Sequence, residues 1–513
     1  MTCCRNFKTR KSPHNANELM KTTNKNTILQ RQPKTTYNNL KPPTQLRTRI
    51  DELSSFRLGD IRGIYPTEIN EDFVHNFAQS LVGQFNLKGK IVTGRDMRMS
   101  SIPLQQALNV SLKNIGINVV DIGLVPTELG YFASAQPGIE AAIIITASHN
   151  PSNYNGIKCV LKNGQAITVD TGLNDIKSKM LESYQHPIKA GSIEQLDLRD
   201  SYMEFLKTQF QSDQFSCGHI ALNGLNGTAA TMAGSIADRF SIDRTWFRKE
   251  PGPIPSQGAD PANPQLVKEM KGFMASREFD LGVTWDGDCD RCVFFDAAGD
   301  LIPTYYMVGL FTDHFLKKHP KSAIVFDTKL YWNTIDIIKQ NGGVPVPAKT
   351  GHGFMKQRMH QSHASYGGEL SAHHYFGSFF GCDSGMFAWL TLMTLFNDSG
   401  QTLSERIAER RGKVCCTPEF SLNLMNTDVA FKTIVAHYKA DAIDLDYFDG
   451  THITLPDECR FSLTPSKTEP LIRLNFESRG QGEALLEHAG DVLRLLEPFR
   501  ADDENWQHHL HLQ

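Results

Sequence analysis

The stretch AAIIITASHNPSNYNGIK, residues 141–158, decides how the rest of this chain is interpreted. It begins with five apolar residues, 141–145, which are typical of a strand buried on both faces. The following TASHNP cannot continue a sheet, because small polar residues and proline favour a turn. Ser148 is therefore expected at the carboxyl end of a buried strand, where open α/β sheets bind their ligands. With His149 beside it, this serine is a candidate nucleophile; for the motif alone, an ordinary polar turn is the alternative.

Length and composition limit the class of protein. The 513 residues suggest three or four domains of about 150 residues each. With 40% apolar residues, 21% charged residues and a net charge of −3, the chain does not resemble a general nucleic-acid binder. No apolar run approaches the ~18 residues that span a bilayer, and the ten cysteines are scattered. We expect a cytoplasmic protein without nucleic-acid or membrane partners.

Residues 1–50 differ from the rest of the chain. They hold eleven lysines and arginines against one acidic residue, Glu18, and show no helix or strand period. Such a segment cannot bury enough apolar surface to offset the entropy of ordering. We expect a disordered basic tail, which is favoured over a transit peptide or a nucleic-acid-binding arm.

From about residue 56 onward, strand and helix patterns alternate, which predicts βαβ units with parallel sheets. After Gly412 the order changes to an α+β pattern. The fold class is therefore α/β, with three similar units and one different unit. The predicted domains are the tail at 1–50, α/β domain I at 51–199, α/β domain II at 200–301, α/β domain III at 302–413 and α+β domain IV at 414–513.

The loop DGDCDR carries three carboxylates at alternating positions, Asp286, Asp288 and Asp290. Oxygen ligands suit Mg²⁺ or Ca²⁺, and an EF-hand is excluded because its distant glutamate is missing. Three adjacent acids repel one another, so a cation is the expected partner; a solvated acidic turn is the alternative. Cys289 and Cys292 also form a C-x-x-C, but no further soft ligands are spaced to complete a zinc site.

Three weaker signals follow. Glu369 and Ser371 on a tight loop suit sugar hydroxyls, although a structural loop is the alternative. His352 is a candidate acid or base, and most single histidines are structural. Residues 466–473, SKTEPLIR, cluster hydroxyls, amides and cations that suit a phosphate, with a capped turn as the alternative.

Together and in this order, the four motifs resemble the α-D-phosphohexomutase superfamily, and within it the bacterial phosphomannomutase (phosphomannomutase/phosphoglucomutase) family. The resemblance covers about residue 56 to the C-terminal helix. TASHNP with NYNGIK resembles the family's phosphoserine loop, DGDCDR its metal loop, GGELSAHHYF its sugar-binding loop and SKTEPLIRLNFES its phosphate-binding loop. The resemblance implies four domains around a central cleft, the first three with a mixed α/β core.

The resemblance also implies an activity. It is that of an isomerase-class phosphomannomutase that interconverts mannose 6-phosphate and mannose 1-phosphate and supplies GDP-mannose synthesis. The reaction would proceed through a phosphoserine and a hexose 1,6-bisphosphate, with Mg²⁺ as cofactor and the bisphosphate as activator, in a monomer or homodimer. Alternatives are a phosphoglucomutase, a dual-specificity enzyme, or an impaired relative that only binds sugar phosphates. A serine hydrolase is disfavoured because no G-x-S-x-G surrounds Ser148.

The resemblance assigns roles residue by residue. It implies that the metal is held by phosphorylated Ser148, Asp286, Asp288 and Asp290. The other catalytic residues that it implies are Arg62, His149, Lys158 and His352. Either Lys158 or His352 would carry the proton. The substrate-binding residues that it implies are Arg291, Lys329, Glu369, Ser371, His373, Ser466, Lys467, Thr468 and Arg473.

Three positions depart from the family pattern. Gly59 stands where the family has tyrosine, Thr464 where it has arginine, and Lys467 where it has asparagine. Loss of the arginine removes a two-pronged phosphate donor, and lysine restores charge without that geometry. We expect weaker substrate binding or an altered phosphate pose, but retained activity, because Ser148 and the three acids are intact.

Overall fold

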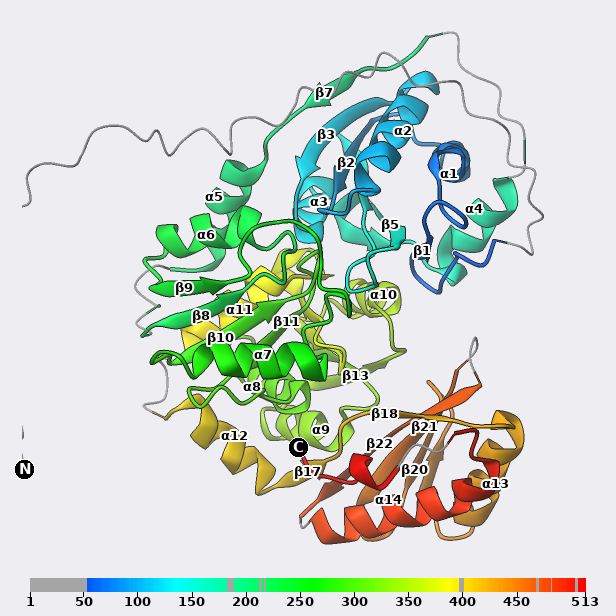
Figure 1. The fold of residues 1–513 in the computed structure, drawn as a ribbon, viewed down its shortest axis with the longest axis vertical. Coiled ribbons are helices and arrows are strands. Elements are labelled where there is room, and N and C mark those ends of the chain that lie inside the picture. Colours follow the sequence, from blue (N-terminus) through cyan, green and yellow to red (C-terminus); the bar gives the residue numbers. More distant parts are fainter. Residues whose placement is uncertain are drawn as a thin grey trace, which may run out of the picture. The chain divides into compact units, whose positions relative to one another are not determined.

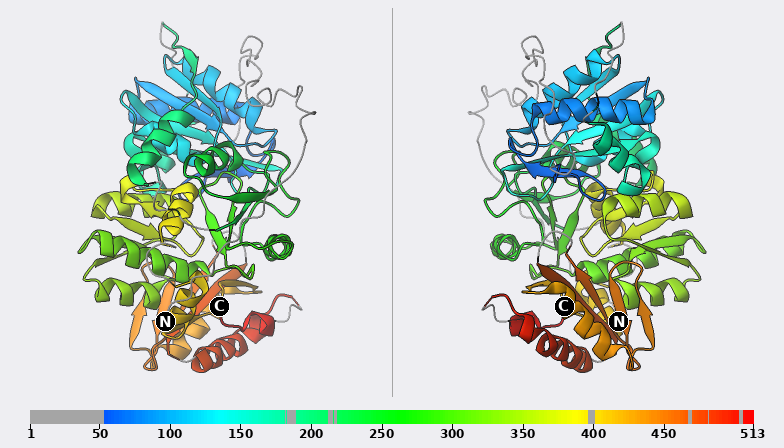
Figure 2. Two further views of the ribbon diagram at one scale, coloured as in Figure 1. Left: turned by 90° about the vertical axis from the view of Figure 1, so that its left-hand side faces the viewer. Right: turned by 90° about the vertical axis from the view of Figure 1, so that its right-hand side faces the viewer.

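A computed structural model of the chain describes residues 53–180, 182, 189–211, 215, 218–395, 401–466, 470–480, 482–502 and 506–513. The predicted tail and two predicted phosphate contacts, Lys467 and Thr468, lie outside these residues. All described residues belong to one unit of contacts, Pro43–Gln513. They form four sheets, each of which falls inside one predicted domain (Figure 1). Figure 2 shows the regions of the four sheets from two further sides, coloured from blue to red along the chain.

The first sheet has the strand order β1-β5-β4-β2-β3-β7, with β6 beside β5. Its strands are β1 (Ile61–Ile64), β2 (Lys90–Arg95), β3 (Asn118–Leu124), β4 (Ile139–Ile145), β5 (Tyr154–Leu161), β6 (Gln165–Ala166) and β7 (Ile193–Gln195). Its helices are α1 (Glu71–Phe85), α2 (Ser101–Asn114), α3 (Thr127–Ser134) and α4 (Asn174–Lys179).

The stretch 141–158 folds as two adjacent strands of this sheet. As predicted, β4 is a buried strand that ends at Ile145, directly before the TASHNP turn. The alternation of strands and helices predicts parallel neighbours, but β5 returns antiparallel, with Lys158 opposite Ile144. The reason is that a short loop joins the two strands, whereas a parallel neighbour needs a long crossover. The return brings Lys158 back beside the end of β4.

The second sheet has the strand order β11-β10-β8-β9, and two of its strands, β10 and β11, flank the acidic loop. Its strands are β8 (Ile220–Asn223), β9 (Arg244–Phe247), β10 (Leu281–Trp285) and β11 (Cys292–Phe295). Its helices are α5 (Arg199–Gln209), α6 (Ala230–Arg239) and α7 (Pro264–Met274). The acidic loop is thus the turn between antiparallel β10 and β11.

The third sheet has the order β13-β12-β14-β15-β16. Its strands are β12 (Ala323–Asp327), β13 (Val344–Ala348), β14 (Tyr366–Gly368), β15 (His374–Phe376) and β16 (Cys382–Asp383). The helices of this part are α8 (Thr304–Lys318), α9 (Tyr331–Gln340), α10 (His352–Ser362), α11 (Gly385–Leu395) and α12 (Leu403–Arg411).

The fourth sheet is antiparallel and is contacted by two helices, α13 (Thr427–Tyr438) and α14 (Gly482–Leu496) (Figure 1). Pro418, which cannot donate to a ladder, lies between the first two strands of this sheet. The strands are β17 (Val414–Cys416), β18 (Phe420–Asn423), β19 (Asp444–Asp446), β20 (Thr451–Thr454), β21 (Cys459–Pro465) and β22 (Leu471–Arg479).

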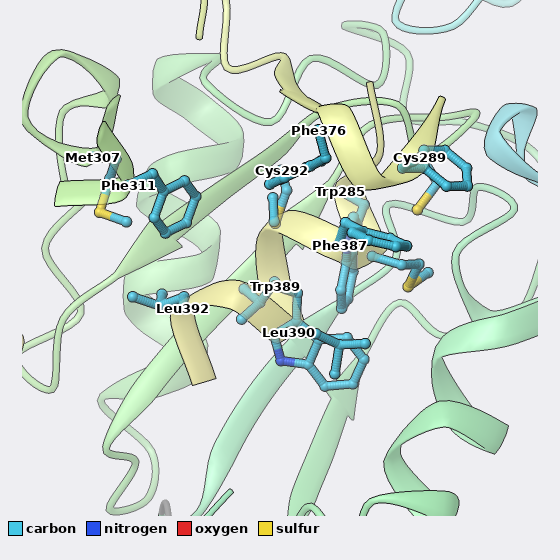
Figure 3. Close-up of a cluster of buried hydrophobic side chains, with 14 of the residues drawn as sticks. Trp285, Cys289, Cys292, Met307, Phe311, Phe376, Phe387, Trp389, Leu390 and Leu392 are labelled. Carbon is cyan, nitrogen blue, oxygen red and sulfur yellow. The ribbon is translucent and has the colours of Figure 1, made fainter. Parts of the chain in front are cut away.

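Helix α11 is buried along its whole length in a hydrophobic cluster that includes side chains from the first three sheets. Figure 3 shows Trp285, at the end of β10, beside Trp389 of α11; their ring centres lie 5.3 Å apart, edge to face. Each such side chain contributes about 1.5–3 kcal/mol of burial energy. Cys289 and Cys292 lie in the same cluster, where burial raises the pKa of both thiols. The acidic loop therefore rests on a rigid apolar base.

Among the described helices, none is both long and apolar enough to cross a bilayer.

Candidate active site

Ser148 follows β4 in a constrained conformation. Its φ is 49°, in the left-handed region, and its side chain is buried. Its backbone N–H donates to Oγ1 of Thr146 at 2.9 Å. Its hydroxyl donates to Oδ2 of Asp286 at 2.5 Å, which joins the two sequence motifs across 138 residues. The nucleophile candidate and the acidic loop are therefore in direct contact.

Arg98 holds the Ser148 loop, and the sequence analysis did not single it out. It is buried and pairs with Asp96 at 3.2 Å. Its guanidinium donates to four loop carbonyls, those of Ser148 at 3.0 Å, Asn150 at 2.6 Å, Pro151 at 2.6 Å and Tyr154 at 3.1 Å. The only sequence signal is the motif GRDMR, which follows strand β2.

Asp286, Asp288 and Asp290 are completely buried, and each offers an oxygen within 4.8 Å of the others. Oδ2 of Asp288 accepts from Thr127 at 2.7 Å and from Thr146 at 3.1 Å. Burial, together with the charges of Asp290 and Asp288, raises the pKa of Asp286 to about 7. The three carboxylates therefore repel one another, and the hydrogen bonds of the loop do not remove this repulsion.

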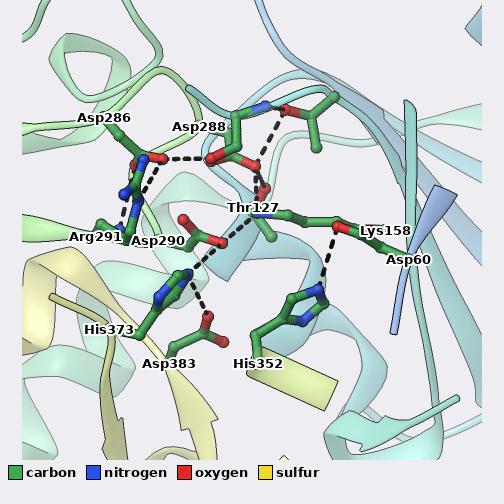
Figure 4. A network of polar contacts seen from close by, with 12 residues as sticks. Asp60, Thr127, Lys158, Asp286, Asp288, Asp290, Arg291, His352, His373 and Asp383 are labelled. Atoms are coloured by element: carbon green, nitrogen blue, oxygen red, sulfur yellow. Dashed lines mark hydrogen bonds and ion pairs between the residues drawn. The ribbon is translucent and has the colours of Figure 1, made fainter. Parts of the chain in front are cut away.

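This donor set fits a divalent cation. Oδ1 of Asp288 and Oδ1 of Asp290 are buried without a hydrogen-bond partner among the described residues, and carboxylate oxygens are the ligands of hard cations. The ammonium of Lys158 compensates part of the charge, 2.8 Å from Asp288 and also in contact with Asp290 (Figure 4). Although burial alone would lower it, these two carboxylates raise the pKa of Lys158.

Arg291 flanks the same loop. Its Nε lies 3.3 Å from Oδ2 of Asp286 and its Nη1 lies 3.5 Å from Asp260. Its Nη2 is buried without a partner among the described residues. One prong of this guanidinium thus remains available to an anion such as a phosphoryl group.

His149 and Arg62 lie at the same end of the site. Nδ1 of His149 lies 3.3 Å from the Ser148 hydroxyl. The charge of Arg291, burial and the charge of Arg62 lower the pKa of His149 well below its usual value, so the ring is neutral. Arg62 donates to the Asn150 side chain at 2.9 Å.

Figure 4 shows His373 joined to Asp290 of the acidic loop and to Asp383, and His352 joined to Asp60. Nε2 of His373 lies 3.5 Å from Asp290 and 3.8 Å from Asp383, and although burial alone would lower it, Asp290 raises its pKa. Nε2 of His352 lies 3.3 Å from Asp60. The two rings stack with centres 6.4 Å apart.

The predicted sugar loop is only partly open. Glu369 is buried and accepts from the Gly351 N–H at 2.6 Å and from the Tyr375 hydroxyl at 2.5 Å. Ser371 is exposed, and its hydroxyl lies 2.9 Å from Nδ1 of His373. Glu369 therefore has fewer free acceptor sites than a carboxylate in solution.

A groove of about 580 Å³ brings together residues from the first, third and fourth sheet regions. The predicted site residues that line it are Lys329, His352, Ser466 and Arg473. Two of the three departures from the family pattern, Gly59 and Thr464, also line it, together with Arg57 and Asp60. Asp60 and His352 belong both to the groove and to the network around the acidic loop. Ser148, the three acids and the sugar-loop residues do not line it.

Lys329 is a largely buried cation of this groove, with 12% of its side chain exposed. Its ammonium lies 2.8 Å from Glu419 and 3.7 Å from Asp327. Although burial alone would lower it, these carboxylates raise its pKa. Glu419 and Asp327, which belong to different sheets, thus keep the lysine protonated and fix the position of its ammonium group.

Three family models match the chain: phosphoglucomutase/phosphomannomutase alpha/beta/alpha domain I over residues 53–186, domain II over 200–299 and domain III over 303–413. A phosphomannomutase of Escherichia coli is 37% identical over 457 residues, which cover 87% of this chain and 100% of that protein. A protein of Xanthomonas campestris pv. campestris named for phosphohexose mutases is 35% identical over 446 residues, 86% of this chain and 99% of that protein.

The solved structures agree. The crystal structure of a phosphoglucomutase/phosphomannomutase family protein from Burkholderia thailandensis is 26% identical and has a TM-score of 0.76, covering 87% of this chain and 97% of that chain. A Paramecium phosphoglucomutase, 16% identical with a TM-score of 0.75, covers 92% of this chain and 98% of its own and shares the fold. The predicted α/β fold and the resemblance drawn from the four motifs are thereby confirmed. The chain belongs to the phosphoglucomutase/phosphomannomutase family.

Proposed function

We propose that this protein is a phosphomannomutase that interconverts mannose 6-phosphate and mannose 1-phosphate through a phosphoserine at position 148. The observation that carries the proposal is the 2.5 Å hydrogen bond between the Ser148 hydroxyl and Asp286, one of three buried acids. The similarity to named phosphomannomutases over most of the chain supports it. We further propose a cytoplasmic monomer or homodimer that supplies GDP-mannose synthesis.

The acids and the cations beside Ser148 would serve phosphoryl transfer. Asp286, Asp288, Asp290 and the Ser148 oxygen would hold Mg²⁺, which when bound supplies positive charge beside the phosphoryl oxygens. The unpartnered prong of Arg291 would bind the phosphoryl group during transfer. Neutral His149, with Nδ1 3.3 Å from the serine oxygen, would share a hydrogen bond with the free Ser148 hydroxyl.

The transfer itself exchanges one bond for another. The bond from phosphorus to the Ser148 oxygen breaks, and a bond from phosphorus to the free hydroxyl oxygen of the hexose phosphate forms. The hydroxyl proton must leave, and Lys158 and His352 are the two side chains proposed to carry it. The bisphosphate then turns over and returns its other phosphate to Ser148, so added hexose 1,6-bisphosphate would activate enzyme that has lost its phosphate.

The groove would hold the phosphate that does not react. Lys329, Ser466 and Arg473 supply two cations and a hydroxyl there, with Lys467 and Thr468 as further proposed contacts. Glu369, Ser371 and His373 are proposed to contact the sugar. Since the same groove must accept the substrate in two orientations, its contacts should suit a phosphate rather than one sugar position.

A phosphoglucomutase or dual-specificity enzyme is the second candidate. The observation that favours it is the similarity to a protein named for phosphohexose mutases, at 35% identity. No residue assigned to the sugar discriminates glucose from mannose by itself. An impaired, binding-only relative is motivated by Gly59 and Thr464, and the intact contact between Ser148 and Asp286 argues against it.

Intact-mass measurement of the purified protein tests the proposal. The wild type should carry one phosphoryl group, and the Ser148→Ala variant should not. Coupled assays with mannose 1-phosphate and glucose 1-phosphate, each with a trace of bisphosphate, then rank the two substrates. Activity should vanish with a chelator and return with Mg²⁺. An unphosphorylated wild type that stays inactive with bisphosphate and Mg²⁺ would refute the mutase.

A further inference from the structure

Arg57 is a charged residue of the groove whose side chain has no partner. It lies shortly before β1, is exposed, and belongs to the wall that the first sheet region contributes. The structure gives its guanidinium no hydrogen bond, ion pair or ring contact with a described residue. An arginine carries five N–H donors, so this group is free to bind an anion that enters the groove.

The backbone around Arg57 is fixed even though its side chain is free. The Arg57 N–H donates to the Asp60 carbonyl at 2.9 Å, and the Leu58 carbonyl accepts from the Val169 N–H at 3.0 Å. Phe56 packs against the apolar core of the first sheet region. The segment is thus anchored on both sides of Arg57, which places its side chain at the groove before any ligand binds.

None of the three acids that line the groove neutralises this guanidinium. Asp60 and Glu419 each pair with another cation, at 2.9 Å and 2.8 Å. Asp449 accepts from a backbone N–H at 2.7 Å. Arg473 also lacks a described hydrogen-bond or ion-pair partner, so Arg57 and Arg473 are two unpaired guanidinium groups in one groove.

The two groups come from different walls. Arg473 lies on β22, directly opposite Thr464 on β21. Residues that face each other across a ladder carry their side chains on the same face, so an arginine at 464 would lie beside Arg473. Thr464 offers only a hydroxyl there. The second guanidinium that lines the groove is therefore that of Arg57, and a doubly charged phosphate matches two such groups.

We propose that Arg57 is a substrate-binding residue that supplies, from the first sheet region, the second guanidinium of the phosphate site. The phosphate that does not react is then bound between Arg57 and Arg473, and Arg57 compensates for the donor that Thr464 lacks. The identity of the ligand rests on the proposed function, whereas the two unpaired cations do not. Arg57 acts on substrate binding and takes no part in the transfer of the phosphoryl group.

The test measures binding separately from turnover. Isothermal titration with mannose 6-phosphate uses the full chain with Ser148→Ala, which cannot form the phosphoserine. Adding Arg57→Gln should raise Kd by about 10-fold or more, because a charge-assisted donor is lost. Arg239→Gln, which removes an exposed arginine of α6 outside the groove, is the matched control and should leave Kd unchanged. An unchanged Kd with Arg57→Gln would overturn the proposal even if the wild type is an active, phosphorylated mutase.

A second substitution separates ligand binding from a structural role. Thr464→Arg places a guanidinium beside Arg473, so it should restore most of the affinity that Arg57→Gln removes and change Kd much less on its own. Arg57→Lys keeps the charge without the fork and should lose affinity only in part. With Ser148 intact, Arg57→Gln should raise KM with little change in kcat. A loss of affinity that Thr464→Arg does not relieve would overturn the proposal, because Arg57 would then act through the structure.

Discussion

The backbone at Ser148 is strained, and this strained conformation sets the direction of the serine hydroxyl. A left-handed conformation at a residue with a side chain costs about 1–2 kcal/mol, and Ser148 adopts it with a φ of 49°. Gly287 lies so close that a Cβ there would meet the Ser148 carbonyl at 2.5 Å. Such strain persists where the surroundings enforce it, and here they aim the hydroxyl at Asp286.

Ser148→Ala removes the atom that would carry the phosphoryl group, while the contacts of the loop with Arg98 remain. We expect mutase activity to fall by about 10³-fold or more, since loss of a nucleophile abolishes the covalent route. Coupled assays with excess bisphosphate measure the residual rate, and circular dichroism checks the fold. Near-normal turnover by this variant would place the phosphoryl carrier elsewhere.

At this scale the sequence predicted the residues that occur in motifs and missed those that do not. The contact between Ser148 and the acidic loop follows from two recognisable strings. Arg98 sits in ordinary surroundings in the sequence, and nothing in composition or spacing marks an arginine as buried. Its role depends on carbonyls from a distant part of the sequence, which only the folded chain brings near it.

At the scale of elements, the loop that follows β4 is held by Arg98, which lies in the connection between β2 and α2. Arg98 follows β2 and binds four carbonyls of the loop after β4. Because β2 and β4 are parallel neighbours, their carboxyl ends lie at one edge, and a single side chain reaches both.

Arg98→Met should remove these bonds and leave Asp96 buried without its cation. Loss of one partner of a buried ion pair costs about 3–5 kcal/mol, so we expect a decrease of that size in the free energy of unfolding. Urea titration measures it. Adding Asp96→Asn to Arg98→Met should restore part of the stability; a single variant as stable as the wild type would show that the loop does not depend on Arg98.

Glu128, on α3, joins three elements at the start of α11. It is buried and accepts from the Tyr202 hydroxyl at 2.9 Å, from the Met386 N–H at 3.2 Å and from the Ser384 hydroxyl. Burial raises its pKa from 4.5 to about 7. The folded protein therefore binds a proton there that the unfolded chain releases.

The sign of the resulting pH dependence follows from linkage. The contribution of Glu128 to stability is complete below pH 4.5 and is lost as pH rises toward 7, by roughly 3 kcal/mol in total. Glu128→Gln should remove this dependence, so its stability relative to the wild type should increase between these pH values. Urea unfolding at several pH values compares the two proteins, and a constant difference would contradict the shifted pKa.

The apolar run 141–145 correctly predicted the buried strand β4. The sequence did not predict helix α10, because HGFMKQRMHQS has few apolar residues and no clear apolar stripe. Both faces of that helix are occupied, one by the third sheet and one by the polar network, so its pattern is set by tertiary contacts. The antiparallel return of β5 was missed for the same reason, because strand direction depends on the connection.

At the scale of the whole molecule, the groove is the feature that no single sheet contains. Its walls come from the first, third and fourth sheet regions. The family resemblance predicted Ser466 and Arg473 as phosphate contacts, and the structure places both beside Lys329 and His352. The presence of Arg57 in the same wall was not predictable, because it depends on how the start of the first domain meets the fourth sheet.

Arg473 on β22 tests this composite groove. Its guanidinium would donate charge-assisted hydrogen bonds to the phosphate that does not react, each worth about 1.5–3 kcal/mol. Arg473→Gln should therefore raise KM by roughly 10- to 100-fold with a smaller change in kcat. Steady-state kinetics at saturating Mg²⁺ measures both, with Arg473→Lys as the matched control. An unchanged KM would remove Arg473 from the phosphate site.

The span of the groove along the chain has a consequence for protein synthesis. Its lining begins at Phe56 and ends at Arg473. When Ser148, the acidic loop and His352 have been synthesised, the ribosome has not yet made β22, which carries Arg473. The nascent polypeptide can thus bring Ser148 and the acidic loop together early, whereas the wall of the groove that contains Arg473 is added only near the end of translation.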